Sequence, residues 1–400
     1  MNADTLYPAD RLAAEKLCAA DPVWNGLDTA AAALGLDGNL LLHAGPPFVS
    51  VETISRPILN SACVAAVFEG LAADFEQAEA MIRAGEVRLE PAQDHRVVTP
   101  LAAVVSASMP LHRVADRSNS DNIIYAPLNG GMRAPIRLGL RDLAVLEHIR
   151  WLNSAFADLC AAALGEPMAL MPIAAEALRD GDDCHGRTPA GTRLMVAQLE
   201  RGLGDYPVDD NLRDFLHNSP PLFLNLWMAA SKCLMLAASG IDGSALVTAA
   251  AGNGVDSGIQ VSGLPGQWFQ AAATPPRGRL DVDLPLDRAL PAIGDSAVVE
   301  GLGLGAMALH QSPEQEKNFA DFLPEDYLER ARRLMSAEHP RLAGLSCPLG
   351  LNARAAVEIG RGPIVGLGIL DITGEKGRLG GGIYDMPCSV FEAAVAALDS

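Results

Sequence analysis

A run of apolar residues from Pro221 to Ile241 constrains this chain most, because so long a segment enters either a bilayer or the centre of a folded core. The run contains Asn225, Ser231 and Lys232. A lysine near the middle of a bilayer is costly. The segment therefore predicts a helix buried at the centre of the protein rather than a membrane span.

The hydrophobic pattern on either side of this segment predicts an α+β, multi-domain fold. Four hundred residues exceed what one hydrophobic core usually serves. Apolar residues recur at helical spacing from Leu143 to Leu164, whereas short apolar or alternating runs occur before and after the middle of the chain. We expect a mixed α/β domain at 1–140, a mostly helical domain at 141–240, and a mixed α/β domain with glycine-rich loops at 241–400.

Three local patterns give further expectations. Residues 1–38 are predicted to be helical, with an interruption at Pro22. Gly380-Gly381-Gly382 is predicted to form a turn after a strand at Pro363–Ile372. Gly301-Leu302-Gly303-Leu304-Gly305 lacks the spacing of a dinucleotide motif, but its free amides could hold an anion where a helix begins.

The strong negative charge limits the classes of partner. The formal net charge is −19 and no cluster of lysines and arginines occurs, so neither nucleic acid nor an anionic membrane is expected to bind. The seven cysteines are scattered, and the N-terminus lacks the apolar stretch of a secretion signal. We expect a cytoplasmic protein without a disulfide framework, a metal site or a nucleotide cofactor.

The densest polar stretch is Asp180–Arg193, between two apolar helix-like segments. His185 is predicted to act as a general acid or base, oriented by Asp182 or Asp183. Arg187 is predicted to bind a carboxylate. Another interpretation stays open, in which this stretch is a solvated loop whose acids cap the following helix. A metal site or a covalent thiol mechanism is disfavoured, because neighbouring residues rarely direct their donors at one centre.

Polar residues in other loops are candidates for the remainder of a substrate site. Asp295 and Ser296 with Glu300, just before the glycine-rich turn, would suit a second polar wall. Each also has a structural alternative, such as helix capping for Asp295 and a surface carboxylate for Glu300. We expect them to meet the Asp180–Arg193 loop in a single cleft, positively charged inside, that binds a small carboxylate or phosphate. Besides Arg187, the candidate substrate-binding residues are His43, Arg96, Asn253, Ser262, Asp295 and Ser296.

Several short motifs occur in a consistent order from about residue 39 to the C-terminus. They are Leu41-Leu42-His43-Ala44-Gly45-Pro46-Pro47, Ser108-Met109-Pro110, Gly181-Asp182-Asp183-Cys184-His185 with Arg187, Phe223-Leu224-Asn225-Leu226, Asn253-Gly254, Val261-Ser262-Gly263 and Ile293-Gly294-Asp295-Ser296-Ala297. Together they resemble the YlbE-like family. Gly186, Thr188 and Pro189 depart from its pattern, which leaves the exact substrate open.

The resemblance implies a fold and a function. Some members are regarded as the AllG subunit of an oxamate carbamoyltransferase in anaerobic allantoin and purine breakdown, which converts oxalurate and phosphate to oxamate and carbamoyl phosphate. The resemblance thus implies a cytoplasmic subunit with a three-part α+β fold. Its partners would include an FdrA protein similar to acyl-CoA synthetases, and a homo-oligomer is also open.

For this reaction, His185 would give a proton to the leaving amide nitrogen. Arginines and glycine amides would bind the substrate anions, and polar side chains would face the developing oxyanion. The alternative is a non-catalytic scaffold or a small-anion-binding subunit, whose FdrA-like partner holds the reactive site. The residues considered for these two binding roles are Arg187, Arg96 and Arg193 for the anions, and Asn253 and Ser262 for the oxyanion.

Overall fold

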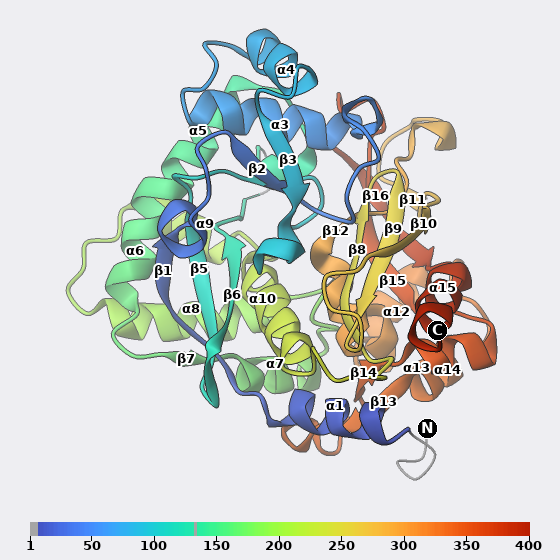
Figure 1. Cartoon of the computed structure of the whole chain (residues 1–400). Coiled ribbons are helices and arrows are strands. Elements are labelled where there is room, and N and C mark those ends of the chain that lie inside the picture. The colour runs from blue at the N-terminus through green and yellow to red at the C-terminus, as the bar shows by residue number, and fades with distance from the viewer. Residues whose placement is uncertain (1–6, 132–133) are drawn as a thin grey trace.

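The computed structural model describes residues 7–131 and 134–400. At its centre lies helix α10 (Leu222–Ala237), nearly all of whose residues are buried. The helix packs against β5 and β6 on one side and against β8 and α11 on the other (Figure 1). The Lys232 ammonium donates a hydrogen bond of 2.7 Å to the Thr248 carbonyl, which satisfies it inside the core. The predicted buried central helix is confirmed.

The first sheet has the strand order β6-β5-β1-β7, and all of its pairs are antiparallel. Of the segment expected to be helical, residues 1–6 lie outside the described residues. Helices α1 (Pro8–Ala19) and α2 (Ala30–Leu34) are present in the remainder, but residues 22–29 form strand β1 instead. Pro22 opens that strand, a place where proline is tolerated, and pairing with β5 buries Val23 and Trp24. The strands are β1 (Pro22–Thr29), β5 (Pro110–Asp116), β6 (Asn119–Pro127) and β7 (Met168–Ala169).

A second, small sheet brings His43 toward the middle of the molecule. Strand β2 (Leu40–His43) pairs in parallel with β3 (Arg88–Pro91) and antiparallel with β4 (Val104–Val105). Helices α3 (Arg56–Phe68) and α4 (Phe75–Arg83) pack together beside it.

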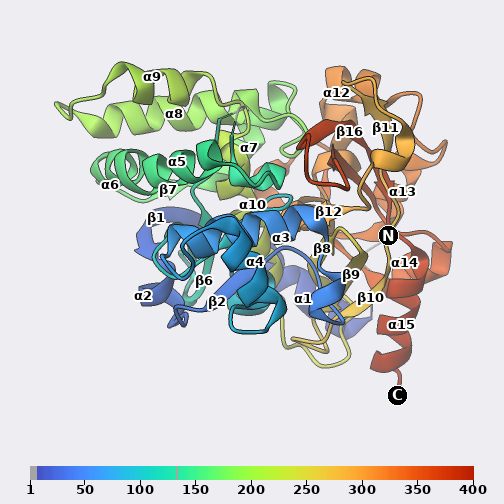
Figure 2. The same cartoon turned by 90° about the horizontal axis from the view of Figure 1, so that it is seen from above.

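The middle of the chain is helical and forms stacked layers beside the first sheet. Figure 2 shows α8 and α9 outermost, with α5 and α6 between them and β1. The helices are α5 (Leu143–Trp151), a π-helical segment (Leu152–Phe156), α6 (Ala157–Ala163), α7 (Leu170–Arg179), α8 (Pro189–Leu203) and α9 (Asp210–His217).

The remainder of the chain forms three further sheets, ordered β10-β9-β8-β12, β11-β16-β15 and β13-β14. The expected turn at residues 380–382 is wrong, because these glycines lie inside β16 between two paired strands. The strands are β8 (Val247–Asn253), β9 (Asp256–Val261), β10 (Phe269–Ala272), β11 (Arg277–Leu280), β12 (Ile293–Gly294), β13 (Met335–Glu338), β14 (Pro348–Leu351), β15 (Ile364–Leu370) and β16 (Arg378–Asp385). The helices are α11 (Val298–Leu302), α12 (Pro313–Phe319), α13 (Tyr327–Leu334), α14 (Ala353–Ile359) and α15 (Cys388–Leu398).

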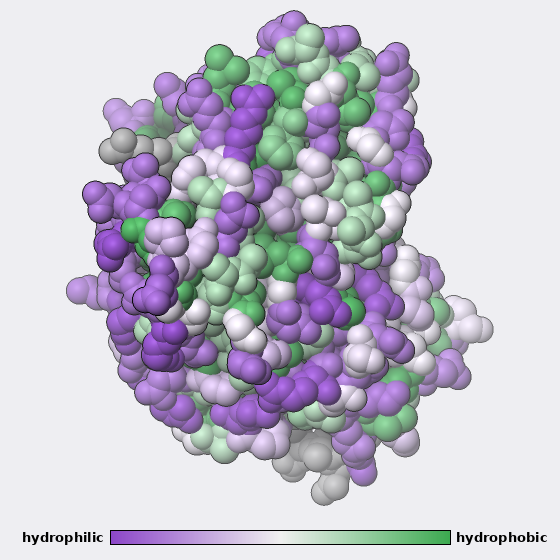
Figure 3. All heavy atoms as spheres, turned by 90° about the vertical axis from the view of Figure 1, so that its left-hand side faces the viewer, coloured by the Kyte–Doolittle hydropathy of each residue, from purple (hydrophilic) through white to green (hydrophobic). Residues whose placement is uncertain are grey.

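The α+β fold class is confirmed, while the division into three domains stays a prediction. One hydrophobic cluster contains residues from all three predicted segments, among them Leu17, Phe156 and Phe391. The face at the left of Figure 1 is largely hydrophilic with hydrophobic residues interspersed (Figure 3). None of the helices in the described residues has both the length and the apolar character that crossing a membrane requires.

The loop after β2 meets the end of β8 in a backbone contact that leaves no room for a side chain. Gly45 has φ +90°, and a Cβ atom there would stand 2.5 Å from the Asn253 nitrogen and 2.5 Å from the Gly252 carbonyl carbon. The Gly45 amide donates to the Asp295 carboxylate at 3.0 Å. This contact joins the small sheet to the segment that carries α11.

We predict that Gly45→Ala destabilises the protein by about 1–3 kcal/mol more than Gly266→Ala, because only the first adds a backbone clash to the cost of a positive φ. Gly266 has φ +79° and open space around its Cβ position. Urea unfolding of the two variants measures the difference. Equal losses would show that the close approach at Gly45 carries no constraint.

Candidate active site

The loop between α7 and α8 places His185 against a carboxylate distant in sequence. His185 Nδ1 lies 2.8 Å from both carboxylate oxygens of Glu300, and both side chains are buried. His185 Nε2 makes no hydrogen bond to a described residue. Because Glu300 accepts at Nδ1, the ring orientation and tautomer are set, and Nε2 remains the nitrogen that can exchange a proton with a substrate.

Two backbone amides, one just after the glycine-rich turn and one in β15, hold Glu300 in place. Oε1 accepts hydrogen bonds from the amides of Ala306, at 2.9 Å, and Gly366, at 3.1 Å. A Cβ atom at Gly305, where φ is +62°, would overlap the Glu300 carboxylate. The amides of Gly303, Leu304 and Gly305, expected to hold an anion, instead donate to the carbonyls of Val299 and Asp183.

The electrostatics of the pair favour a protonated imidazole. Burial lowers the pKa of His185, but the Glu300 carboxylate and, beyond it, Asp183 outweigh burial and raise the pKa above its ordinary value of 6.5. Burial also raises the pKa of Asp183, opposed by the amides of Arg187 and His185. His185 can therefore carry a proton near neutral pH, as a general acid must.

Asp182 and Asp183 shape the loop, while Glu300 orients the ring. Asp183 Oδ1 accepts from the amides of His185, at 2.8 Å, and Arg187, at 2.9 Å. Asp182 Oδ2 accepts from the Gly191 amide at 2.8 Å, inside the first turn of α8. Burial raises the pKa of Asp182 to about 6. The orienting carboxylate that we expected within this loop thus comes from α11, and the capping interpretation holds for Asp182.

The arginines expected to form a positive lining are paired or lie elsewhere. Arg187 forms an ion pair of 2.8 Å with Glu314, and Arg193 forms one of 2.6 Å with Asp180. Exposed Arg96, with φ 59°, donates to the Asp121 carbonyl at 2.7 Å. The groups nearest His185 are therefore mainly carboxylates, so an anion bound there must be neutralised by cations from another element.

Asp295 is the centre of a second buried cluster. Its carboxylate accepts from the Gly45 amide, the Gln93 side chain, and both the amide and the hydroxyl of Thr99, at 2.8–3.0 Å. Burial raises the Asp295 pKa to about 6, opposed by these donors. Asp295 and Glu300 lie on the same short segment, so the two clusters are connected through α11.

His43 and Asn253 adjoin Asp295 and have backbone partners. Asn253 Nδ2 donates to the Pro46 carbonyl, and its Oδ1 accepts from the amides of Val255 and Asp256. His43 Nδ1 pairs with the Ala44 carbonyl at 2.7 Å, and burial lowers the His43 pKa to about 4. Both residues organise the contact around Gly45.

Ser262 lies apart from Asn253, although both were candidates for one oxyanion. The Ser262 hydroxyl donates to the Ala238 carbonyl and accepts from the Ile241 amide. Val247 pairs with Val261, so Ser262 and Asn253 lie at opposite ends of the β8–β9 hairpin, about 20 Å apart along the strand. The two cannot serve one small substrate. Ser296 is buried beside Gly294.

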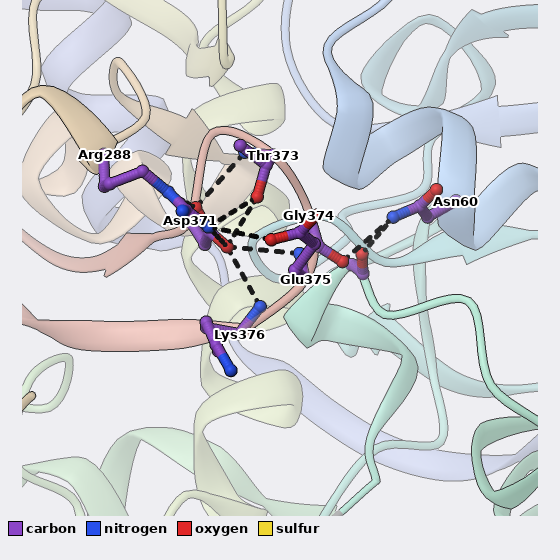
Figure 4. A network of polar contacts seen from close by, with 8 residues as sticks. Asn60, Arg288, Asp371, Thr373, Gly374, Glu375 and Lys376 are labelled. Carbon is purple, nitrogen blue, oxygen red and sulfur yellow. Dashed lines mark hydrogen bonds and ion pairs between the residues drawn. The ribbon is translucent and has the colours of Figure 1, made fainter. Parts of the chain in front are cut away.

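The loop that joins β15 to β16 lies against α3 and residue 139. Asp371 accepts from the amides of Thr373, Glu375 and Lys376 and forms a two-pronged ion pair with Arg288, whose bonds are 2.7 and 2.8 Å long (Figure 4). These donors hold the Asp371 pKa well below its ordinary range. The loop is therefore rigidly folded.

The amide of Asn60 attaches that loop to the N-terminal half of the chain. Asn60 Nδ2 donates to the carbonyls of Gly139, at 2.9 Å, and Gly374, at 3.2 Å (Figure 4). Neither contact could be predicted from the sequence, because both join Asn60 to backbone groups of residues that are distant from it in the chain.

Gln93 and Thr99 are the polar residues that sequence reasoning missed, whereas Glu300 was expected in a second polar wall but not as the partner of His185. Glu300 had a signal, since it immediately precedes the Gly301–Gly305 turn.

Two surface cavities, of 790 and 720 Å³, are lined by segments other than those carrying the candidate residues. Across residues 7–131 and 134–400, no group of three or more His, Cys, Asp or Glu side chains is arranged to hold a metal ion.

Comparison with known proteins shows which family the chain resembles. The family model described as oxamate carbamoyltransferase subunit AllG matches residues 87–296. The chain is 31% identical to oxamate carbamoyltransferase subunit AllG of Escherichia coli strain K12, over 96% of this chain and 95% of that protein. It is 32% identical to the uncharacterized protein YahG of the same strain, over 98% of this chain and 86% of that protein.

A solved structure has the same fold. The crystal structure of a conserved protein of unknown function from Enterococcus faecalis V583 superposes with a TM-score of 0.92 at 27% identity, and the match covers 98% of this chain and 97% of that one. The α+β architecture thus extends over the whole length of both chains.

The raised His185 pKa predicts how stability depends on pH. The folded protein binds this proton more tightly than the unfolded chain does, so the stabilisation is fully present below pH 6.5 and is lost as the pH rises through the raised pKa. Between pH 6.5 and 8, the free energy of unfolding should fall more steeply for the native protein than for His185→Gln. His217→Gln, which removes an exposed histidine paired with Glu200, should follow the native curve. Parallel curves for all three proteins would contradict the assignment.

Proposed function

The chain belongs to the family of oxamate carbamoyltransferase subunit AllG, and we propose that it carries the proton-transferring site of a complex that moves a carbamoyl group from oxalurate to phosphate. The buried pair of His185 and Glu300 is the observation that carries this proposal. A histidine with one nitrogen fixed by a carboxylate and the other without a protein partner is arranged for acid–base work.

The reaction needs a proton at the nitrogen that leaves. A phosphate oxygen attacks the ureido carbonyl carbon of oxalurate, and the bond from this carbon to the inner nitrogen breaks. That nitrogen keeps the bonding electron pair and takes a proton, which gives oxamate, while the carbamoyl group remains on phosphate. His185 Nε2 is the proposed donor of that proton, and the Glu300 carboxylate stabilises the imidazolium before the transfer.

The other predicted residues have supporting roles in this proposal. Asp183 fixes the loop through two amides, so that the imidazole faces Glu300. Asp295 fixes the start of the segment that carries Glu300. Arg187 is proposed to bind a substrate anion only after leaving Glu314, because the two now form an ion pair.

The complex would include further subunits. We place an FdrA-like protein, similar to acyl-CoA synthetases, beside this chain, in the cytoplasm, in a pathway of allantoin and purine breakdown. The family's printed description as a subunit supports an assembly of several chains.

A second candidate is a non-catalytic scaffold or small-anion-binding subunit. It is favoured by the enclosure of the pair, since His185 is only 7% exposed and the Glu300 side chain is fully buried. In that case the partner would hold the reactive groups, and the His185–Glu300 pair would only stabilise the loop.

Turnover of a reconstituted complex distinguishes the two candidates. His185→Ala should reduce the rate of carbamoyl phosphate formation by about 10²–10⁴-fold while the complex still assembles. His217→Ala is the matched control, because it also breaks a histidine–glutamate pair but an exposed one. Unchanged turnover of a fully assembled His185→Ala complex would support the scaffold and exclude the proposed role.

A further inference from the structure

Arg137 is a buried cation whose acceptors are all uncharged. It lies in a single 3-10 turn (Ile136–Leu138) and is 8% exposed. Its Nη1 donates to the Asn129 side-chain oxygen at 2.9 Å and to the Gly130 carbonyl at 3.4 Å, and its Nη2 donates to the Gly131 carbonyl at 2.8 Å. A guanidinium has five N–H donors. Its Nε–H donates to none of the described residues, so part of the group remains available to a ligand.

The second deeply buried arginine shows how this protein neutralises such a charge. The Arg330 side chain is 1% exposed and forms ion pairs with Asp326, at 2.9 Å, and Asp385, at 2.7 Å. By contrast, no Asp or Glu among the described residues forms an ion pair with Arg137. A buried charge without a counter-charge is costly, so a negative group that the chain itself does not supply would stabilise Arg137.

A second cation adds to the charge at this place. Arg378, at the start of β16, follows Gly377, where a Cβ atom would lie 3.3 Å from Leu138. Burial and, to a smaller extent, the charge of Arg378 lower the Arg137 pKa to about 10. Arg378 forms an ion pair of 2.6 Å with exposed Asp281. Because Asp281 pairs with Arg378 alone, the charge of Arg137 keeps no carboxylate partner among the described residues, in a protein whose net charge is −19.

Strand β15 connects these cations with the His185–Glu300 pair. Side chains two residues apart on a strand face the same side, about 7 Å from each other. At Gly366 a Cβ atom would lie 3.9 Å from the Glu300 carboxylate, and at Gly368 it would lie 3.9 Å from Arg378 Nε. Glu300 and Arg378 therefore lie beside the same face of β15, at positions about 7 Å apart along the strand.

The surrounding contacts hold Arg137 rigidly. Asn60 bonds to the carbonyl of Gly139 and to the β15–β16 loop (Figure 4), and Gly377 of that loop packs on Leu138. A cation fixed before the ligand arrives loses little conformational freedom on binding.

We propose that Arg137, with Arg378 beside it, binds the negatively charged end of the substrate, an oxyanion of the carboxylate or phosphate class. This inference rests on the proposed function and adds where the substrate anion sits relative to His185. The guanidinium receives the counter-charge that it lacks, while the far end of the substrate extends along β15 toward His185 Nε2. Arg137 is thus a substrate-binding residue, and Arg187 is not needed for this contact.

The inference is tested by calorimetric titration of the full chain with oxamate and, separately, with inorganic phosphate. Chloride keeps the ionic strength constant and serves as the reference anion. The native protein should bind at least one of the two, and Arg137→Gln should weaken that binding by at least about tenfold, because a charge-assisted contact is lost. Arg213→Gln, which removes an exposed arginine of α9, should leave the affinity unchanged. Preference for oxamate identifies the carboxylate as the bound group, and preference for phosphate identifies the phosphoryl group.

Two surface variants keep the test decisive if Arg137→Gln does not fold. Arg378→Gln should weaken binding, and Asp281→Asn should strengthen it, because Asp281 competes with the ligand for Arg378. The inference is overturned if Arg137→Gln binds like the native protein, if Arg378→Gln and Asp281→Asn leave the affinity unchanged, or if the native protein binds neither anion at millimolar concentration. Failure of the two proposals is distinguishable, because Arg137→Gln is expected to weaken binding of the free anions, whereas His185→Ala is expected to lower the turnover of the assembled complex.

Discussion

The site depends on a buried hydrogen bond between an imidazole and a carboxylate that are 115 residues apart in the chain. Glu300 would be costly in this place without donors, and the amides of Ala306 and Gly366 supply them. Each donor requires a particular backbone arrangement, which the glycine at 305 and the pairing of β15 provide. The fold around α11 is therefore organised to keep one negative charge beside one histidine.

The same segment connects that pair to the other half of the molecule. Asp295, five residues before Glu300, accepts hydrogen bonds from the loop after β2 and from Thr99. Because Asp295 and Glu300 belong to one short stretch of chain, displacement of the small sheet would move the carboxylate that orients His185. The packing of α11 against α10 and β8 therefore supports both the core and the carboxylate beside His185.

Sequence reasoning located the polar centres but not their connections. The burial of α10 and the concentration of polar groups in the His185 loop followed from local composition. The Glu300 partner did not, since contacts across 115 residues depend on tertiary packing. The charge of the site was also misjudged: Arg187 and Arg193 lie beside acids, whereas Arg137 shows its lack of a counter-charge only once its neighbours in space are known.

Histidine nitrogen NMR tests the central claim most directly. Spectra of the protein labelled at its imidazole nitrogens, with the His185 signals assigned by their loss in His185→Gln, give the pKa and the protonated nitrogen of that ring. We predict titration above pH 6.5 and a neutral form protonated at Nδ1, as the Glu300 contact requires. Titration at or below pH 6.5, or a neutral form protonated at Nε2, would contradict the account.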